Sequence, residues 1–187
     1  MNITVQEKYN FPLLKTFDVD SEITNFLNLK FDEYFQHHDL IPAENIVYVS
    51  ETGGYTMNLL EWKNIEYQKF LNSNIIDVIA KCLDLSRDDF YLHYNHMFDY
   101  ACGGYVKEHK HDHAEDYVFI FYLNDCSTGE TVFFLNNHNE IDKQRTSIRV
   151  YPNKNRGVCF SSMLFHKAEY TNEAKKIFVV GVKLKIA

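Results

Sequence analysis

The sequence predicts an α+β fold in which a helix-rich first half braces a C-terminal antiparallel β-barrel. Two observations support this. Apolar residues recur at helical spacing before about residue 90, and short runs rich in Phe, Tyr, Val and Ile follow it. The chain has 187 residues and no repeat or low-complexity linker, so one domain is expected. About residues 1–89 would be a mixed but helix-rich support, and about residues 90–187 the β-barrel core.

Two segments of the first half have the pattern of amphipathic helices. Residues 20–36 begin with Asp-Ser and bring Ile23, Leu27 and other apolar residues onto one face. Residues 57–84 predict one or two further helices. In the second half, turn-like clusters separate the strand-like runs FYLHYNHMF, YVFIFYLN, ETVFFL, SIRVYP, GVCFSSML and KIFVVGVKLKI. Many short strands of this kind are typical of a sandwich or barrel.

Composition narrows the class of protein. The net charge is −7 and the basic residues are scattered, which argues against nucleic-acid binding through a broad basic face. The cysteines form no CxxC pair, which fits a reducing cytosol. The N-terminus lacks a signal-peptide pattern, and no apolar run approaches the ~20 residues that span a bilayer. We therefore expect a cytoplasmic protein without a membrane partner.

The stretch EHKHDHAEDY is the first candidate for a functional site. It places His109, His111 and His113 at alternating positions, so in a strand their side chains share one face. Two imidazoles on one strand can chelate an ion if a third ligand arrives from elsewhere. By itself, the stretch fits a solvated charged turn equally well.

His166 is the candidate third ligand. It follows the apolar run GVCFSSMLF and precedes another strand, so it can meet the histidine pair across a barrel. Two close histidines with a third about fifty residues later match the spacing of facial non-haem iron sites. The remaining histidines read as surface or hydrogen-bonded polar residues: His37, His38, His93, His96 and His138.

The last strand suggests a buried cation. Lys176 shares a face with Phe178, Val180 and other apolar residues, while the opposite face carries three lysines and reads as the solvated one. We therefore expect Lys176 to point inward, where an ammonium needs an anionic partner such as a bound carboxylate. Alternatively, Lys176 reaches solvent from the start of the strand.

Together these features resemble the 2-oxoglutarate and Fe(II)-dependent dioxygenases, in particular their prolyl-hydroxylase-like branch. The resemblance covers the C-terminal half, from about Tyr100 onward. It rests on order and spacing in the segments GGYVKEHKH, FIFYLND, STGETVFF and FSSMLFH, followed by Lys176 ten residues after His166. It implies a double-stranded β-helix, that is, a jelly-roll or cupin-like barrel.

The family's HxD motif is replaced here. The chain resembles a short phage and marine-bacterial subfamily that carries HxH, with an aromatic residue four positions earlier; Tyr105 stands four before His109. This register selects His109 and His111. The pair His113 and Glu115, a literal HxE, is the main rival, and His111 with His113 is the third option. The site is therefore either a three-histidine site or one completed by a nearby carboxylate.

The resemblance also implies the chemistry. Fe(II) would be held by His109, His111 and His166, and 2-oxoglutarate would pair its far carboxylate with Lys176 and Tyr122. With O2, the enzyme would oxidise, most simply hydroxylate, a C–H bond of a small-molecule or peptidyl substrate and release succinate and CO2. The sequence names neither the substrate nor the oligomeric state.

Two other functions remain open at this point. A cupin-type enzyme with a three-histidine iron site could oxidise its substrate without 2-oxoglutarate, in which case an inward-facing lysine has no role. A jelly-roll binding or structural module could hold a structural metal or none.

Overall fold

The computed structural model describes residues 5–6, 14–42, 53–111, 114–135 and 146–185. Its helices are α1 (Ser21–His37), α2 (Ile65–Phe70), a π-helical turn (Leu71–Ile75), α3 (Ile76–Leu83) and 3-10 turns at Leu59–Glu61 and Arg87–Asp89. Its strands are β1 (Val5–Gln6), β2 (Leu14–Asp18), β3 (Ile41–Pro42), β4 (Gly54–Tyr55), β5 (Phe90–Tyr100), β6 (Val106–His109), β7 (Tyr117–Tyr122), β8 (Thr131–Phe134), β9 (Ser147–Val150), β10 (Arg156–Ser161), β11 (His166–Ala168) and β12 (Lys175–Leu184).

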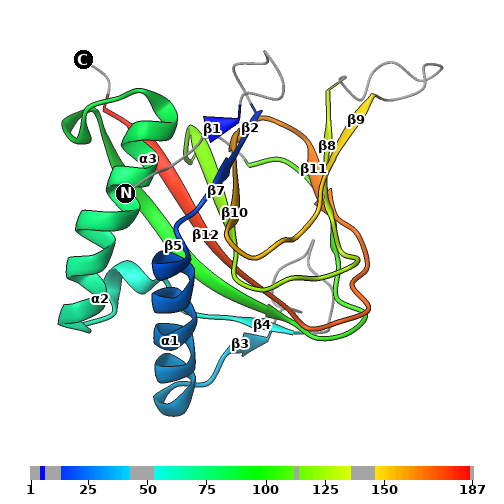
Figure 1. The fold of residues 1–187 in the computed structure, drawn as a ribbon, viewed down its shortest axis with the longest axis horizontal. Coiled ribbons are helices and arrows are strands. Elements are labelled where there is room, and N and C mark those ends of the chain that lie inside the picture. The colour runs from blue at the N-terminus through cyan, green and yellow to red at the C-terminus, as the bar shows by residue number, and fades with distance from the viewer. Residues whose placement is uncertain (1–4, 7–13, 43–52, 112–113, 136–145, 186–187) are drawn as a thin grey trace.

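The described strands form two antiparallel sheets. The larger has the order β1-β2-β10-β7-β12-β5-β4-β3 and the smaller the order β6-β11-β8-β9. The smaller sheet lies on one side of the larger, and α1, α2 and α3 cover the other side (Figure 1). The molecule is thus mostly antiparallel sheet with a few helices, as the sequence predicts.

The helix predicted over residues 20–36 is confirmed as α1. Its N-cap is Asp20, whose carboxylate accepts a hydrogen bond from the backbone N–H of Glu22 at 3.0 Å. The second predicted helical segment is confirmed as α2 and α3, joined by the π-helical turn. It ends at Asp84, whose φ of 56° takes the chain out of the helix.

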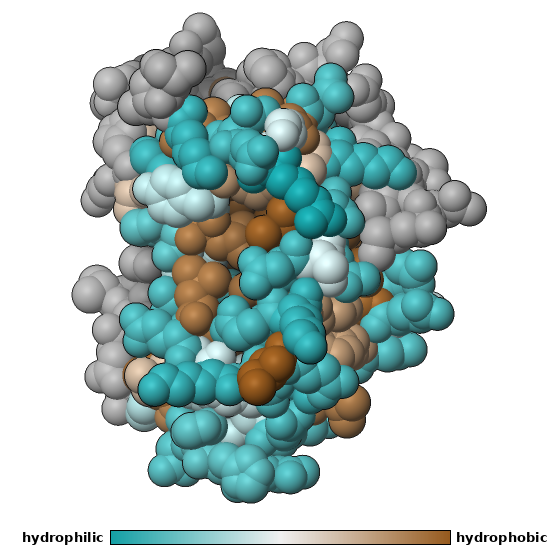
Figure 2. All heavy atoms as spheres, turned by 90° about the vertical axis from the view of Figure 1, so that its left-hand side faces the viewer, coloured by the Kyte–Doolittle hydropathy of each residue, from teal (hydrophilic) through white to brown (hydrophobic). Residues whose placement is uncertain are grey.

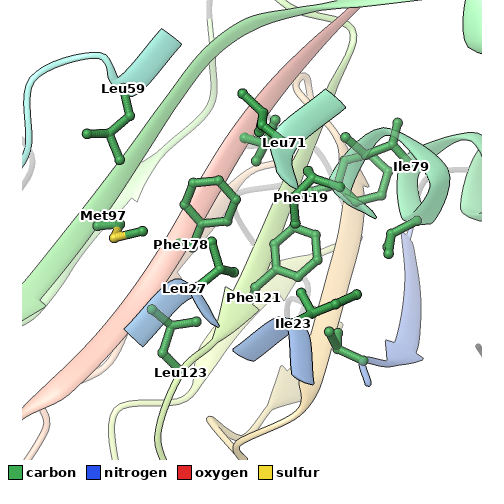
Figure 3. Close-up of a cluster of buried hydrophobic side chains, with 14 of the residues drawn as sticks. Ile23, Leu27, Leu59, Leu71, Ile79, Met97, Phe119, Phe121, Leu123 and Phe178 are labelled. Carbon is green, nitrogen blue, oxygen red and sulfur yellow. The ribbon is translucent and has the colours of Figure 1, made fainter. Parts of the chain in front are cut away.

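Between these helices and the larger sheet lies one of two hydrophobic cores. In Figure 3 the α1 side chains Ile23 and Leu27 approach Phe121 and Phe178 of the sheet, and each of the four is at most 1% exposed. Burial of whole aliphatic and aromatic side chains stabilises by roughly 1.5–3 kcal/mol each. This core therefore fixes α1 onto the sheet and sets which side chains of the sheet face the helices.

Strand β12 lies in the middle of the larger sheet, between β7 and β5, and both of its faces are buried. Phe178, Val180 and Val182 pack in the core under the helices. Ile177 and Val179 belong to the second core, between the two sheets. A strand with two buried faces has no solvated side, so its lysines cannot be assigned to a face by solvent exposure.

The first half of the chain also contributes strands to the larger sheet. Strand β2 pairs with β10, and β4 pairs with β5. The helix-rich prediction for the first half did not single out these strands, because runs of two to five residues show no clear alternation. Both halves of the chain therefore build one sheet.

The helix-covered side carries hydrophobic residues at its centre, surrounded by hydrophilic ones (Figure 2). On α1 and α2 the side chains of Leu29, Phe35 and Ile65 are exposed. Among the described residues, no helix has both the length and the apolar character needed to cross a membrane.

Candidate functional site

A cavity of about 390 Å³ lies between the two sheets. Its wall includes side chains from β5, β6, β11 and β12, which are far apart in the sequence. The predicted histidines His109, His111 and His166 all line it, together with one lysine of the last strand. The cavity is therefore where the candidate residues can be compared directly.

The three predicted histidines form one cluster. Each offers a ring nitrogen, and these three atoms lie within 4.8 Å of one another. His109 ends β6 and His166 begins β11, and the two residues are direct cross-strand partners. His111 follows β6 and is held by its backbone N–H, which donates to the Ser162 carbonyl at 2.9 Å. Strand pairing thus produces the cluster that the spacing predicted.

The hydrogen bonds of the three rings decide which nitrogen is available. Nδ1 of His109 lies 2.9 Å from the Lys107 carbonyl, and Nδ1 of His166 lies 2.9 Å from the Leu164 carbonyl. A carbonyl only accepts, so both Nδ1 atoms carry the hydrogen. Nδ1 of His111 contacts the carboxylate of Glu115. Nδ1 of each ring thus faces an acceptor, so Nε2 is the nitrogen that would coordinate a cation, the arrangement typical of metal-ligating histidines.

Burial favours the neutral form of two of these imidazoles, His109 and His166, by lowering their pKa. It lowers the pKa of His109 to about 4, and the neighbouring His111 lowers it further, against the opposing hydrogen bond to Lys107. Burial also lowers the pKa of His166 well below its ordinary value, helped by His109. A metal competes with protons for such nitrogens, so a low pKa prepares the site for a cation at neutral pH.

The metal-free protein is expected to lose stability on acidification. His109 titrates near pH 6.5 when unfolded and near 4 when folded, so the unfolded chain gains protons first as the pH falls. The stabilisation is complete above pH 6.5 and is lost between 6.5 and 4, about 3 kcal/mol in all. Urea unfolding at pH 7 and pH 5 should measure about 2 kcal/mol of this loss, the part that falls between pH 6.5 and 5. A His109→Gln variant should show a weaker pH dependence; an unchanged dependence would contradict the assignment.

The prediction that Lys176 faces the site is wrong. Its ammonium lies 3.1 Å from the carboxylate of Asp32 on α1 and 4.8 Å from the centre of the Phe31 ring. Lys176 shares its face with the apolar residues, as predicted, but that face packs against the helices and not against the cavity. The error arose because the lysine-rich face was taken as solvated, whereas both faces of β12 are buried.

Lys175 occupies the position predicted for Lys176. It lines the cavity, is 2% exposed, and donates to the Gly129 carbonyl at 2.9 Å. Its ammonium also lies 4.9 Å from the centre of the Tyr100 ring. Within the described part of the chain, no carboxylate lies in ion-pairing distance of Lys175. Burial lowers its pKa to about 8. The cavity thus contains a cation that lacks a carboxylate partner among these residues.

Tyr122 is fully buried, and its hydroxyl lies 2.7 Å from Oγ1 of Thr131. Thr131 lines the cavity, while Tyr122 stands behind it. Gly129, the hydrogen-bond acceptor of Lys175, is two residues before Thr131. The segment Gly129–Thr131 therefore brings the lysine and the two hydroxyls into one region, and Thr131 is a site residue that the sequence did not reveal.

Both rival ligand pairs, His113 with Glu115 and His111 with His113, include His113, which lies outside the described residues. Glu115 is described and is 2% exposed. Its carboxylate accepts from Nδ1 of His111 and from the Tyr94 hydroxyl at 3.0 Å, so it stands behind a histidine of the cluster. Burial raises its pKa, but the contacts with His111 and Tyr94 outweigh burial and the net shift is downward.

A row of rings on β5 forms one wall of the cavity: Tyr94, His96, Phe98 and Tyr100. His93 also lines it, although His93 and His96 were expected to face opposite sides of a regular strand. Gly181 pairs with Tyr94 and Val182 with Leu92, so the pairing skips His93. This bulge breaks the regular alternation, which lets His93 and His96 line the same cavity. Nδ1 of His96 lies 2.9 Å from the Thr56 carbonyl, so it is a hydrogen-bonded histidine as predicted.

Comparison with known proteins gives a clear result only at the level of structure. No family model matches the chain. No curated protein matches it either.

Solved structures with matching folds are numerous. A prolyl-4-hydroxylase from Pseudomonas putida has a TM-score of 0.66 at 12% identity, covering 92% of this chain and 93% of that one. A prolyl hydroxylase from Trichoplax adhaerens has a TM-score of 0.67 at 14% identity, covering 93% and 84%. The non-haem α-ketoglutarate-dependent epimerase SnoN has a TM-score of 0.68 at 10% identity, covering 91% and 78%. The resemblance inferred from the sequence is thus confirmed in the fold, which is the double-stranded β-helix of 2-oxoglutarate/Fe(II) oxygenases.

Proposed function

We propose that the protein is an Fe(II)- and 2-oxoglutarate-dependent oxygenase that oxidises, most simply hydroxylates, a C–H bond of its substrate. One observation carries this proposal: a single cavity is lined by a cluster of three histidines, whose ring nitrogens lie within 4.8 Å of one another, and by a buried lysine. Among solved structures with the same fold, SnoN is recorded in complex with Fe3+ and α-ketoglutarate. The proposal treats the chain as a single catalytic domain, since strands of both halves share one sheet.

The histidine cluster fits a divalent iron. Its three donors are imidazole nitrogens, which suit iron, and the Nδ1 atom of each ring already faces an acceptor. We assign His109, His111 and His166 as the metal ligands. This set contains no carboxylate among the described residues, in contrast to the two-histidine, one-carboxylate triad.

Lys175 fits the far carboxylate of 2-oxoglutarate. A buried ammonium is costly without an anion, and a bound carboxylate would supply one. The Thr131 hydroxyl would donate to the same carboxylate, and the Tyr122 hydroxyl, by donating to Oγ1 of Thr131, would orient it. The role inferred for Tyr122 therefore becomes an indirect one, exerted through Thr131, and the role inferred for Lys176 passes to Lys175.

When bound, Fe(II) supplies the activation of O2 that couples decarboxylation of 2-oxoglutarate to succinate with oxidation of the substrate. The chain contributes position and environment. The histidines, which are held in place by hydrogen bonds to the backbone, would bind the cation, and Lys175 would bind the co-substrate. The rings of β5 would cover one side of the cavity against water. The substrate is either a small molecule or a peptidyl residue.

Anaerobic titration tests the proposal directly. Adding 2-oxoglutarate to the Fe(II)-loaded protein should produce a visible charge-transfer band, and admission of O2 should release succinate. Pyruvate is the matched control, because it has the same keto-acid end but no far carboxylate for Lys175. It should bind at least about tenfold more weakly, since it forgoes a charged hydrogen bond. The absence of both the charge-transfer band and succinate would exclude this function and would favour a cupin-type oxygenase or a binding module.

A further inference from the structure

Glu115 is a buried carboxylate that the proposed chemistry does not use. It lines the cavity, is 2% exposed, and its Oε1 accepts from Nδ1 of His111 and from the Tyr94 hydroxyl. A carboxylate that is buried this fully is retained only with strong partners. Both partners belong to the site: one is a histidine of the cluster, and the other is part of the ring wall.

The position of Tyr94 depends on a glycine in the middle of the sheet. Gly181 of β12 is the direct partner of Tyr94, and a Cβ at Gly181 would lie 2.3 Å from the Tyr94 ring. The missing side chain lets the ring lie over the strand. The bulge in β5 occurs at the same point, opposite Gly181 and Val182. A glycine and a bulge weaken a central strand, and both are often found beside functional sites.

A three-histidine site has a charge deficit that Glu115 can correct. Three neutral imidazoles bring no negative charge to a dication, whereas the usual facial triad brings one through its carboxylate. A carboxylate that accepts from the Nδ1–H of a ligand makes that imidazole more basic and fixes its orientation. Because Glu115 is buried, solvent screens its negative charge little, so the charge also acts on the cation directly.

We propose that Glu115 is a positioning residue for the metal that supplies, through His111, the negative charge that the three-histidine site lacks, and that Tyr94 holds Glu115 in place. The inference rests on the proposed function only in that His109, His111 and His166 hold the metal. It does not require that the protein use 2-oxoglutarate.

The test is the affinity for Co(II), measured by competition with a chromogenic chelator at pH 7.5 in the absence of 2-oxoglutarate. Glu115→Gln keeps an oxygen that can accept from His111 but removes the charge; Glu115→Ala removes both. We expect Glu115→Gln to bind about 10–100-fold more weakly and Glu115→Ala at least as weakly. Tyr94→Phe should lose less, about two- to tenfold. Glu33→Gln, in which the carboxylate is bonded to Lys30 and Asn64 on the helix side, is the matched control and should bind as the wild type.

Thermal unfolding of the metal-free variants separates metal binding from folding, because a merely structural role lowers the melting temperature and leaves the Co(II) affinity unchanged. Two results would overturn the inference: wild-type affinity in both Glu115 variants, or loss in Glu115→Ala with wild-type affinity in Glu115→Gln, which would assign the effect to shape and not to charge. If the wild-type protein binds Co(II) but does not turn over 2-oxoglutarate with iron, that result would instead count against the proposed function alone.

Discussion

Replacing Lys175 with methionine is expected to weaken 2-oxoglutarate binding by about 100-fold or more. The variant keeps the length and apolar stem of the side chain but leaves the far carboxylate of the co-substrate in the cavity without its cation. Removing one partner of a buried ion pair costs about 3–5 kcal/mol, and each 1.4 kcal/mol is tenfold in affinity. Isothermal titration of the anaerobic Fe(II)-loaded protein with 2-oxoglutarate measures the loss.

Lys176→Met is the matched control. Lys176 is the adjacent residue, but its ammonium pairs with Asp32 on the helix side, where an ion pair this exposed contributes little. We expect its 2-oxoglutarate affinity to stay within about twofold of the wild type. If Lys176→Met loses the affinity and Lys175→Met retains it, the co-substrate pocket has been assigned to the wrong face of β12.

The charge of Lys175 also predicts the pH dependence of this affinity. Because burial lowers its pKa to about 8, the free lysine is charged below pH 8 and increasingly neutral above it. The anionic co-substrate binds the charged form, so the apparent affinity should be constant below pH 8 and fall about tenfold per unit above it. Titrations at pH 7 and 9 measure the change, and Lys175→Met should show no such fall.

Replacing His166 with alanine is expected to abolish metal binding. His166 is fixed by its pairing with His109 and by the hydrogen bond from its Nδ1 to Leu164, and its loss leaves two donors of the cluster. Mutation of a residue that hydrogen-bonds to a metal ligand typically weakens metal affinity by about 10–100-fold. Removal of the ligand itself should therefore weaken it by more than about 100-fold. The Co(II) absorption spectrum and chelator competition measure the effect.

His93→Ala provides the control for His166→Ala, because His93 lines the same cavity but lies outside the cluster. It should bind Co(II) as the wild type does. Thermal unfolding of metal-free His166→Ala shows whether the buried truncation also affects the fold. A folded His166→Ala protein that binds Co(II) within tenfold of the wild type would show that other residues hold the metal.

Local patterns determined much of this protein. Alternation along a strand placed His109 and His111 on one face, and the apolar runs around His166 marked a strand that could meet them. The helix α1 followed from a capping Asp20 and an apolar stripe, because both signals lie within one segment. These features depend on the chain nearby, so the sequence alone could establish them.

The tertiary structure decided which lysine faces the cavity and what stands behind the histidines. Alternation states that Lys175 and Lys176 point opposite ways, but a strand buried on both sides gives no sign of which face meets the site. The apolar run IFVVGV could have indicated that neither face is solvated. The contact between Glu115 and Tyr94 depends on the bulge in β5 and on Gly181 in β12, two strands that are neighbours in the sheet but far apart in the sequence. Such pairings are set by the register of the assembled sheet, and a shift of one residue would reverse every assignment.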